Sequence, residues 1–245
     1  MEIRIPTPEL QLSRRLLNLA YSGDDLAKGN EWSVHGERLF AEFLLDQGAA
    51  TGQRYWLINR LCLVEGSDID HLLVGPTGIH VYESKFWQGL VVCRDGHWAH
   101  WRYEDGAFVP VPINQPPDLQ AIQNMEDVAS YLHARLPGVD AGLSLDHRVP
   151  IRGGVVFTYP GAQCIFHRPL LACATLDFLR NHPDSTWALQ FLPWGAPIIP
   201  QFDQKTQLLV VRTLIQGHRN ASPRTPHLRE QALAQIEREL DASLP

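Results

Sequence analysis

The sequence predicts a mixed α/β fold in which a mixed central β-sheet is flanked by helices. Three observations support this prediction: helical periodicity comes first, five or six β-rich segments follow, and further helical segments complete the chain. Hydrophobic residues make up 44% of the 245 residues and charged residues 20%, which favours a packed core and argues against global disorder. A chain of this length fits one large domain, or a core domain with a smaller attachment.

Two helices are expected before the strands. Residues 9–26 show partial helical periodicity, with a turn cluster around Gly23. Residues 30–36 are expected to form a loop that leads into a helix at 37–47, where apolar residues recur at helical spacing. Gly48 stands where a helix typically ends.

The period then changes to that of β-strands. The expected strands are 55–64, 69–75, 79–85, 90–94, 97–103 and 108–111. Asp95-Gly96 is a strong signal for a hairpin turn between two of them. After the Asn114–Pro117 turn we expect a helix at 119–136, a strand at 155–159, helices at 176–181, 204–216 and 227–240, and a linker at 220–226.

Composition also bears on partners and location. The N-terminal residues show no secretory signal and no apolar run approaches the ~20 residues that span a bilayer, so we expect a cytoplasmic protein without a membrane segment. The net charge of −6 argues mildly against a surface coated for nucleic acid, yet no acid occurs between Asp203 and Glu230. Buried side chains are the preferred interpretation of the four cysteines, over a zinc site at Cys164, His167 and Cys173.

Residues 68–85 carry the pattern that points to chemistry. If this segment folds as a hairpin about Pro76-Thr77, position 74 faces 79, 72 faces 81, 70 faces 83, and 68 faces 85. The shared face is then apolar near the turn and charged at the far end, where Asp70, Glu83 and Lys85 lie together. His71 and His80 fall on the opposite face, where packing is the preferred interpretation.

Two acids that face each other across strands destabilise a sheet unless a positive charge lies between them. Lys85 could supply part of that charge, and a divalent cation such as Mg²⁺, which prefers carboxylate and water oxygens, would supply more. Such a site suits phosphodiester hydrolysis. An acid followed by Glu-x-Lys is, however, also typical of a solvated strand edge, and this alternative remains open at the level of spacing.

Several ordered motifs resemble those of the nuclease-related domain (NERD) family. They are Gly36-Glu37, Ile69-Asp70-His71, Gly78-Ile79, Glu83-Ser84-Lys85, Trp87-Gln88-Gly89 and the segment Asn114–Gln120. That family is similar to the PD-(D/E)xK nucleases, so the resemblance implies a restriction-endonuclease-like fold. It also implies a core at 31–135, an N-terminal helical extension at 1–30, and a C-terminal region at 136–245. The C-terminal region would complete or cap the core, with a basic linker and a terminal helix.

The resemblance further implies a role for each matching residue. Asp70 and Glu83 would be metal ligands, with the backbone carbonyl of Ser84 as a third and Lys85 as the catalytic lysine. Glu37 would complete the acidic cluster or hold a metal-bound water. Gln120 would contact the substrate backbone or brace the site. The implied cofactor is Mg²⁺ or Mn²⁺.

We therefore expect a metal-dependent nuclease that hydrolyses phosphodiester bonds, with DNA as the expected partner. A binding or interaction module that kept the fold without activity is the alternative, and a hydrolase of other phosphate esters is a third hypothesis. The sequence contains no Walker A phosphate loop, no Gly-x-Ser-x-Gly nucleophile elbow and no His-Glu-x-x-His helix. These absences argue against an NTPase, a serine hydrolase and a zinc protease.

Overall fold

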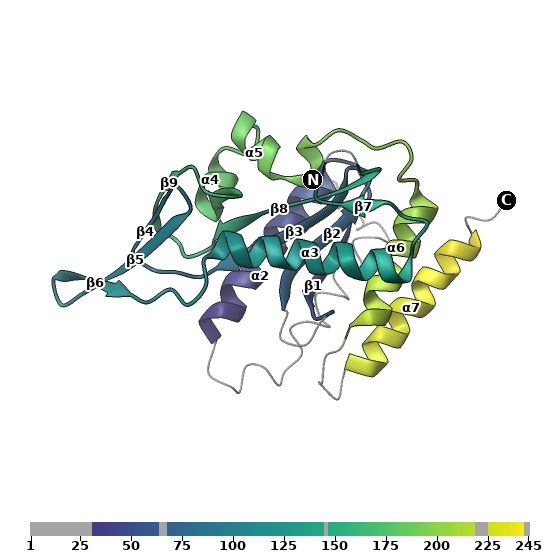
Figure 1. Ribbon diagram of the computed structural model, residues 1–245, viewed down its shortest axis with the longest axis horizontal. Helices are drawn as coiled ribbons and strands as arrows, with labels where there is room; N and C mark the ends of the chain where they lie inside the picture. Colours follow the sequence, from purple (N-terminus) through teal and green to yellow (C-terminus); the bar gives the residue numbers. More distant parts are fainter. Residues whose placement is uncertain (1–30, 64–67, 145–146, 219–224, 243–245) are drawn as a thin grey trace, which may run out of the picture.

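The computed structural model describes residues 31–63, 68–144, 147–218 and 225–242, which form two β-sheets and six α-helices (Figure 1). The predicted mixed α/β class is therefore confirmed. The expected helix at 9–26 and the N-terminal extension lie outside the described residues, as does most of the linker at 220–226.

The main sheet is mixed, as predicted. Its strands lie in the spatial order β1 (Trp56–Leu61), β2 (Ile69–Gly75), β3 (Gly78–Lys85), β8 (Val149–Phe157) and β10 (Ala172–Thr175), and the short β7 (Ala141–Gly142) also pairs with β8. β1, β2 and β3 pair antiparallel, whereas β3–β8 and β8–β10 pair parallel. The C-terminal region thus supplies β8 to the middle of the sheet. The domain boundary near residue 135 stays a prediction.

A second, four-stranded sheet lies at one end of the molecule (Figure 1). Its order is β6 (Ala107–Val111), β5 (His97–Glu104), β4 (Leu90–Arg94) and β9 (Gln163–His167). β4, β5 and β6 pair antiparallel through the two Asp-Gly turns, and β9 joins β4 in parallel. The turn residues Asp95 and Asp105 have φ of 50° and 48°, each followed by a glycine that also has positive φ, as tight hairpin turns require.

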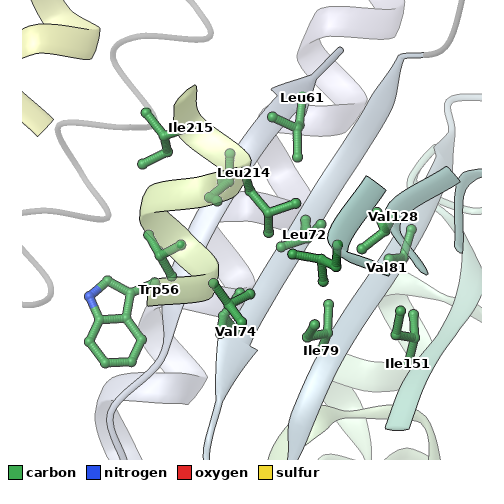
Figure 2. Packing of buried hydrophobic residues seen from close by; sticks show 14 of the residues in the cluster. Trp56, Leu61, Leu72, Val74, Ile79, Val81, Val128, Ile151, Leu214 and Ile215 are labelled. Atoms are coloured by element: carbon green, nitrogen blue, oxygen red, sulfur yellow. The ribbon is translucent and has the colours of Figure 1, made fainter. Parts of the chain in front are cut away.

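Helices cover both faces of the main sheet. One face carries α2 (Glu31–Ala50), α4 (Leu176–Asn181), α5 (Thr186–Phe191) and the short 3₁₀ helix η2 (Pro193–Gly195); the other carries α3 (Pro117–Arg135), α6 (Gln204–Gly217) and α7 (Thr225–Ala242). Alternation along the strands divides the core accordingly. Leu72 and Val74 join the cluster beneath α3 and α6 (Figure 2), whereas Leu73 joins the cluster beneath α2. β2 is consequently buried along its whole length.

The structure corrects the expected start of α2. The sequence predicts a loop at 30–36, but the helix begins at Glu31 and includes Gly36. The reason is close packing: a Cβ atom at Gly36 would lie 2.5 Å from Thr158 Oγ1 and 2.8 Å from Phe86 Cβ. Glycine at this position lets the helix approach the ends of β3 and β8.

Other strand boundaries also differ from the prediction. β1 ends at Leu61, before the expected 64, and β8 begins at Val149, six residues before the expected start. The sequence did not predict β9, β10 or α5. These elements are short, and each gains its stability from tertiary packing rather than from a long periodic pattern.

Buried Asp118 joins α3 to the second sheet. Its carboxylate accepts hydrogen bonds from Trp98 Nε1 at 2.9 Å, from the Leu119 amide at 2.9 Å and from the Leu170 amide at 3.0 Å. Trp98 belongs to β5 and Leu170 to the turn between β9 and β10. One side chain therefore fixes the start of α3 against two segments that carry the second sheet.

We expect Asp118→Ala to lower the free energy of unfolding by about 3 kcal/mol, because it leaves buried N–H groups without acceptors, each costing about 1–3 kcal/mol. Urea unfolding measures the loss. The control is Asp127→Ala on the same helix, where the carboxylate accepts an exposed hydrogen bond from Gln123; its effect should stay within about 0.5 kcal/mol. Equal effects of the two substitutions would contradict the role of Asp118.

The fold bears on the expectations for the cysteines and for a membrane segment. Cys93 and Cys173 are buried, and the three-residue set Cys164, His167 and Cys173 does not form a metal-binding group within the described residues. In the described part of the chain, none of the helices has the length and apolar character needed to cross a membrane.

Candidate active site

The predicted hairpin register holds over most of its length. Leu72 pairs with Val81 and Val74 with Ile79, and the ladder continues to His71 and Tyr82. The expected pairs 70/83 and 68/85 are wrong as ladder partners. Counted from the turn, the last paired residues of β2 and β3 are His71 and Tyr82. The strands separate where the charged residues begin.

Asp70 occupies the gap between the separating strands. Its carboxylate Oδ2 accepts a hydrogen bond from the Ser84 amide at 2.7 Å and another from the Ser84 hydroxyl at 3.1 Å. On the other side, Arg60 of β1 adopts a left-handed φ of 53° and is passed over in the β1–β2 register. Interrupted ladders on both sides leave room for a carboxylate between strands.

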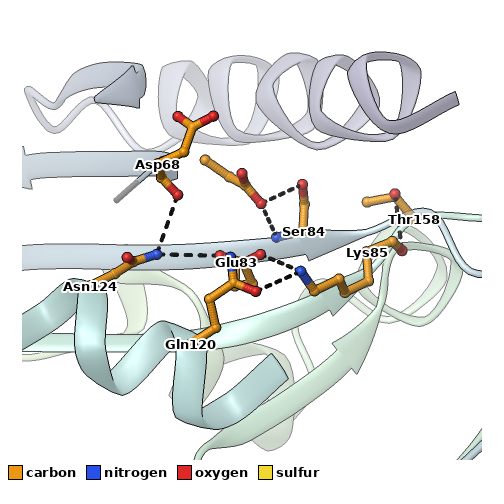
Figure 3. Close-up of polar contacts among 8 residues, drawn as sticks. Asp68, Glu83, Ser84, Lys85, Gln120, Asn124 and Thr158 are labelled. Atoms are coloured by element: carbon orange, nitrogen blue, oxygen red, sulfur yellow. Dashed lines mark hydrogen bonds and ion pairs between the residues drawn. The ribbon is translucent and has the colours of Figure 1, made fainter. Parts of the chain in front are cut away.

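Glu83 and Lys85 lie on the face of β3 that is covered by α3 (Figure 3). Lys85 Nζ donates to Glu83 Oε1 at 2.5 Å and to Gln120 Oε1 at 2.9 Å. Asn124 Nδ2 donates to Glu83 Oε2 at 3.3 Å and approaches the Asp68 carbonyl at 3.5 Å. Each charged side chain is thus held by an amide side chain of α3.

Burial sets the electrostatics of the two acids. Glu83 is 1% exposed and Asp70 9%. Desolvation raises the pKa of Glu83 well above its usual value, and the neighbouring charge of Asp70 raises it further, against the opposing effect of Lys85. Desolvation also raises the pKa of Asp70, although Lys85 and the Ser84 amide act in the opposite direction. The positive charge of Lys85 therefore does not offset the desolvation of both Asp70 and Glu83.

Glu37 lies on α2, on the other side of the sheet, and is buried. Its Oε2 is 3.6 Å from Arg60 Nε, and Arg60 also reaches Asp68 Oδ2 at 3.4 Å. Arg60 therefore connects Glu37 to Asp68, just before the start of β2. The role of Glu37 in the acidic cluster stays a prediction.

The two histidines of the hairpin are set apart from the acids, as expected. His71 Nδ1 is 2.7 Å from Asn59 Oδ1, and His80 Nε2 is 2.9 Å from Thr77 Oγ1. Complete burial lowers the pKa of each imidazole to about 3, so both are neutral at physiological pH. Both are core histidines with a local polar contact, and Nε2 of His71 is buried without a hydrogen-bond partner among the described residues.

A cleft of about 730 Å³ opens beside Lys85 and Gln120. Its further walls come from the residues after β3, from β5, from the segment between β6 and α3, and from Tyr159 after β8. The polar network at the end of β3 thus meets a space large enough for a ligand.

Five of the six predicted site residues are brought together here. Asp70, Glu83, Ser84, Lys85 and Gln120 are connected by hydrogen bonds or by adjacency on β3. A family model described as a nuclease-related domain matches residues 33–158, which include all six. The chain belongs to the nuclease-related domain family. No curated protein and no solved structure matches the chain.

Membership in the nuclease-related domain family implies a nuclease with a nucleic-acid substrate. The matched region also contains two residues of the site network that sequence analysis did not single out, Asn124 and Arg60. Asn124 follows Gln120 by four positions on α3, so both lie on the same face of this helix. This spacing could have predicted that Asn124 also faces the site. Arg60 carried no signal, because its importance depends on a left-handed backbone conformation.

Within the described ranges of the nuclease-related domain, no group of three or more His, Cys, Asp and Glu side chains could hold a metal ion. Asp70 and Glu83 are the two buried carboxylates of this site that could contribute to holding a cation, together with backbone oxygen and water. This donor set fits Mg²⁺, which is commonly held by one or two carboxylates and keeps several waters. The uncompensated burial of the two acids fits the same cation.

Proposed function

We propose that this chain is a metal-dependent nuclease that hydrolyses phosphodiester bonds in DNA, on a restriction-endonuclease-like fold. One observation carries the proposal: two buried carboxylates and a lysine meet at the separated ends of β2 and β3, beside an open cleft. Burying acids with raised pKa values costs stability, and such costs are typical of functional sites. Mg²⁺ or Mn²⁺ is the proposed cofactor.

Asp70 and Glu83 would hold the metal, which when bound polarises the phosphate and lowers the pKa of a coordinated water. Ser84 orients Asp70 through its amide and hydroxyl, and its carbonyl is the proposed third protein ligand. Glu37 is proposed to support this cluster from α2, through the contact of Arg60 with Asp68.

Lys85 is the proposed catalytic lysine. Its side chain is 17% exposed and lines the cleft, so a phosphate entering there meets a positive charge. It would hydrogen-bond a non-bridging oxygen and help to orient the attacking water. Gln120 accepts a hydrogen bond from Lys85, so its proposed role is to brace the lysine rather than to supply chemistry.

The test is direct cleavage of nucleic acid by the purified chain. Linear duplex DNA, circular DNA, single-stranded DNA and RNA are incubated with Mg²⁺, with Mn²⁺ or with EDTA, beside the Asp70→Asn variant. We expect cleavage of DNA only with a divalent cation, and its loss in Asp70→Asn while the melting temperature in EDTA shows that the variant is folded.

The outcomes separate the hypotheses. DNA binding without cleavage under any condition would overturn the nuclease proposal in favour of a binding module on the same fold. Cleavage of small phosphate esters that DNA does not inhibit would identify a different phosphoesterase. Cleavage that persists in EDTA would contradict the role proposed for the two carboxylates.

A further inference from the structure

The walls of the cleft beside Lys85 are rich in aromatic rings. Trp87 stacks on His100, with ring centroids 4.9 Å apart and planes 10° from parallel. Phe86 contacts Tyr159 edge to face, with centroids 5.1 Å apart. We call the space bounded by these two pairs and by Arg102 the aromatic cleft.

The Trp87–His100 pair is supported from behind by two contacts. Trp87 packs edge to face on Phe157, a fully buried residue of β8, with centroids 5.8 Å apart. The imidazole of His100 lies 2.8 Å from the Gln88 carbonyl through Nε2. Rings whose positions are fixed in this way lose little entropy on binding, which suits stacking against another flat ring.

The charge of the aromatic cleft is opposite to that of the whole chain. Its lining includes Lys85 and Arg102 and contains no carboxylate among the described residues, whereas the net charge of the chain is −6. The Arg102 guanidinium is about half exposed beside Glu104, at 2.6 Å, and projects from the face of β5 that carries His100. A phosphate that enters the cleft could therefore meet Lys85 or Arg102, and at Arg102 it would share the guanidinium with Glu104.

Size and composition together select the form of nucleic acid. A volume of about 730 Å³ is that of a small-molecule pocket and is enough for one or two nucleotides. Aromatic side chains and cations in one groove are the combination that binds unpaired bases. Amide side chains at Gln88, Asn114 and Gln115 add donors and acceptors along the wall.

We propose that the aromatic cleft binds an unpaired nucleotide adjacent to the phosphate at Lys85, so that the substrate is single-stranded DNA or an unpaired DNA end. This inference rests on the proposed function and specifies its substrate class. Arg102 positions the neighbouring phosphate, while Trp87, which stacks on the buried His100, and the Phe86–Tyr159 pair hold the base.

The test measures binding in EDTA, where cleavage is prevented. Fluorescence anisotropy compares a labelled single-stranded oligonucleotide with a blunt duplex of two annealed strands, for the wild type and for Tyr159→Ala and Arg102→Ala. We expect the single strand to bind at least 10-fold more tightly than the duplex. Each substitution should weaken single-strand binding about 10-fold, which lies within the usual range for a stacking contact of about 1–3 kcal/mol.

The β5–β6 hairpin offers a matched control. Tyr103 and Phe108 are exposed aromatic residues on the opposite face of this hairpin from Arg102, and they do not line the aromatic cleft. The double variant Tyr103→Ser, Phe108→Ser should bind the single strand as the wild type does. A loss in this control equal to that in Tyr159→Ala would overturn the inference.

A second measurement guards against variants that fail to fold. Bound single strands should quench tryptophan fluorescence, and the conservative Trp87→Phe variant should keep the affinity and lose part of the quenching. Equal binding of duplex and single strand, with no effect of Tyr159→Ala, overturns the inference even if DNA is cleaved. Tight single-strand binding without cleavage in any metal overturns the proposed function instead.

Discussion

Replacing Lys85 with methionine should lower kcat for DNA cleavage by about 10²- to 10⁴-fold, the usual range for a group that assists proton transfer or stabilises charge in the transition state. Methionine keeps an unbranched apolar stem of similar length, so packing changes little. The ammonium contacts Glu83 and Gln120 in the resting protein, and it lines the cleft where the phosphate would lie.

Single-turnover and steady-state kinetics measure this effect, because they separate the chemical step from binding. We expect KM to change by only a few fold. Lys205→Met, at an exposed position near the start of α6, is the matched control and should leave both constants unchanged. If Lys85→Met cleaves at the wild-type rate, Lys85 is not part of the chemistry.

Glu83→Gln should make the protein more stable at pH 8 in EDTA, by about 1–3 kcal/mol, the order of magnitude associated with buried charges. The folded state raises the pKa of Glu83 above its ordinary value of 4.5, so the folded state binds more protons than the unfolded state between these two values. The free energy of unfolding of the wild type therefore falls as the pH rises through that window. The glutamine variant has no carboxylate at this position and therefore avoids the free-energy cost of burying a charge.

Urea unfolding near pH 5 and pH 8, with and without Mg²⁺, measures these differences. The gain in Glu83→Gln should shrink at the lower pH, because the raised pKa of Glu83 lets a larger fraction of the wild-type carboxyl be protonated there. Mg²⁺ should raise the melting temperature of the wild type at pH 8 and have little effect on the variant, because a ligand stabilises only the state that binds it. Glu126→Gln, an exposed acid on α3, is the control. A variant that is less stable than the wild type at pH 8 would contradict this balance of charges.

The hairpin was the most predictable part of the site. Alternating apolar residues and a Pro-Thr turn predicted that Val74 faces Ile79 and that Leu72 faces Val81, and both pairs are confirmed. Where the strands separate, the same logic failed, because the departure of Asp70 from the ladder depends on a hydrogen bond to the Ser84 amide. Local alternation contains no information about such a tertiary contact.

Glycines explain the largest errors in element boundaries. Gly153 weakened the pattern of a strand in β8, and sequence analysis therefore found only the apolar end of that strand. In the structure a Cβ at Gly153 would lie 2.0 Å from the Val81 carbonyl, so the small residue is required by the pairing with β3. At Gly36, within the segment expected to be a loop, a Cβ atom would likewise meet Thr158 and Phe86. At both positions, close contact with residues distant in sequence leaves no room for a side chain.

The assignment of strands to two sheets was also beyond sequence analysis. β4 pairs with β9, and the two are separated by the whole of α3 and by β8. Short-range patterns identify hairpins, whereas long-range parallel pairs carry no turn signal. The aromatic cleft, which lies where the second sheet meets the end of β3, could not be anticipated for that reason.

The parallel pairing of β3 with β8 has a consequence for the order in which the chain acquires its structure during synthesis. β3 runs between β2 and β8, and the amide of Thr158, just past β8, donates to the Lys85 carbonyl at 2.9 Å. A nascent chain that has emerged only through α3 has one edge of β3 without its partner, and long-range parallel pairing is slow to form. The strand that carries Glu83 and Lys85 therefore gains its second hydrogen-bonded neighbour only after residues 149–158 have been synthesised.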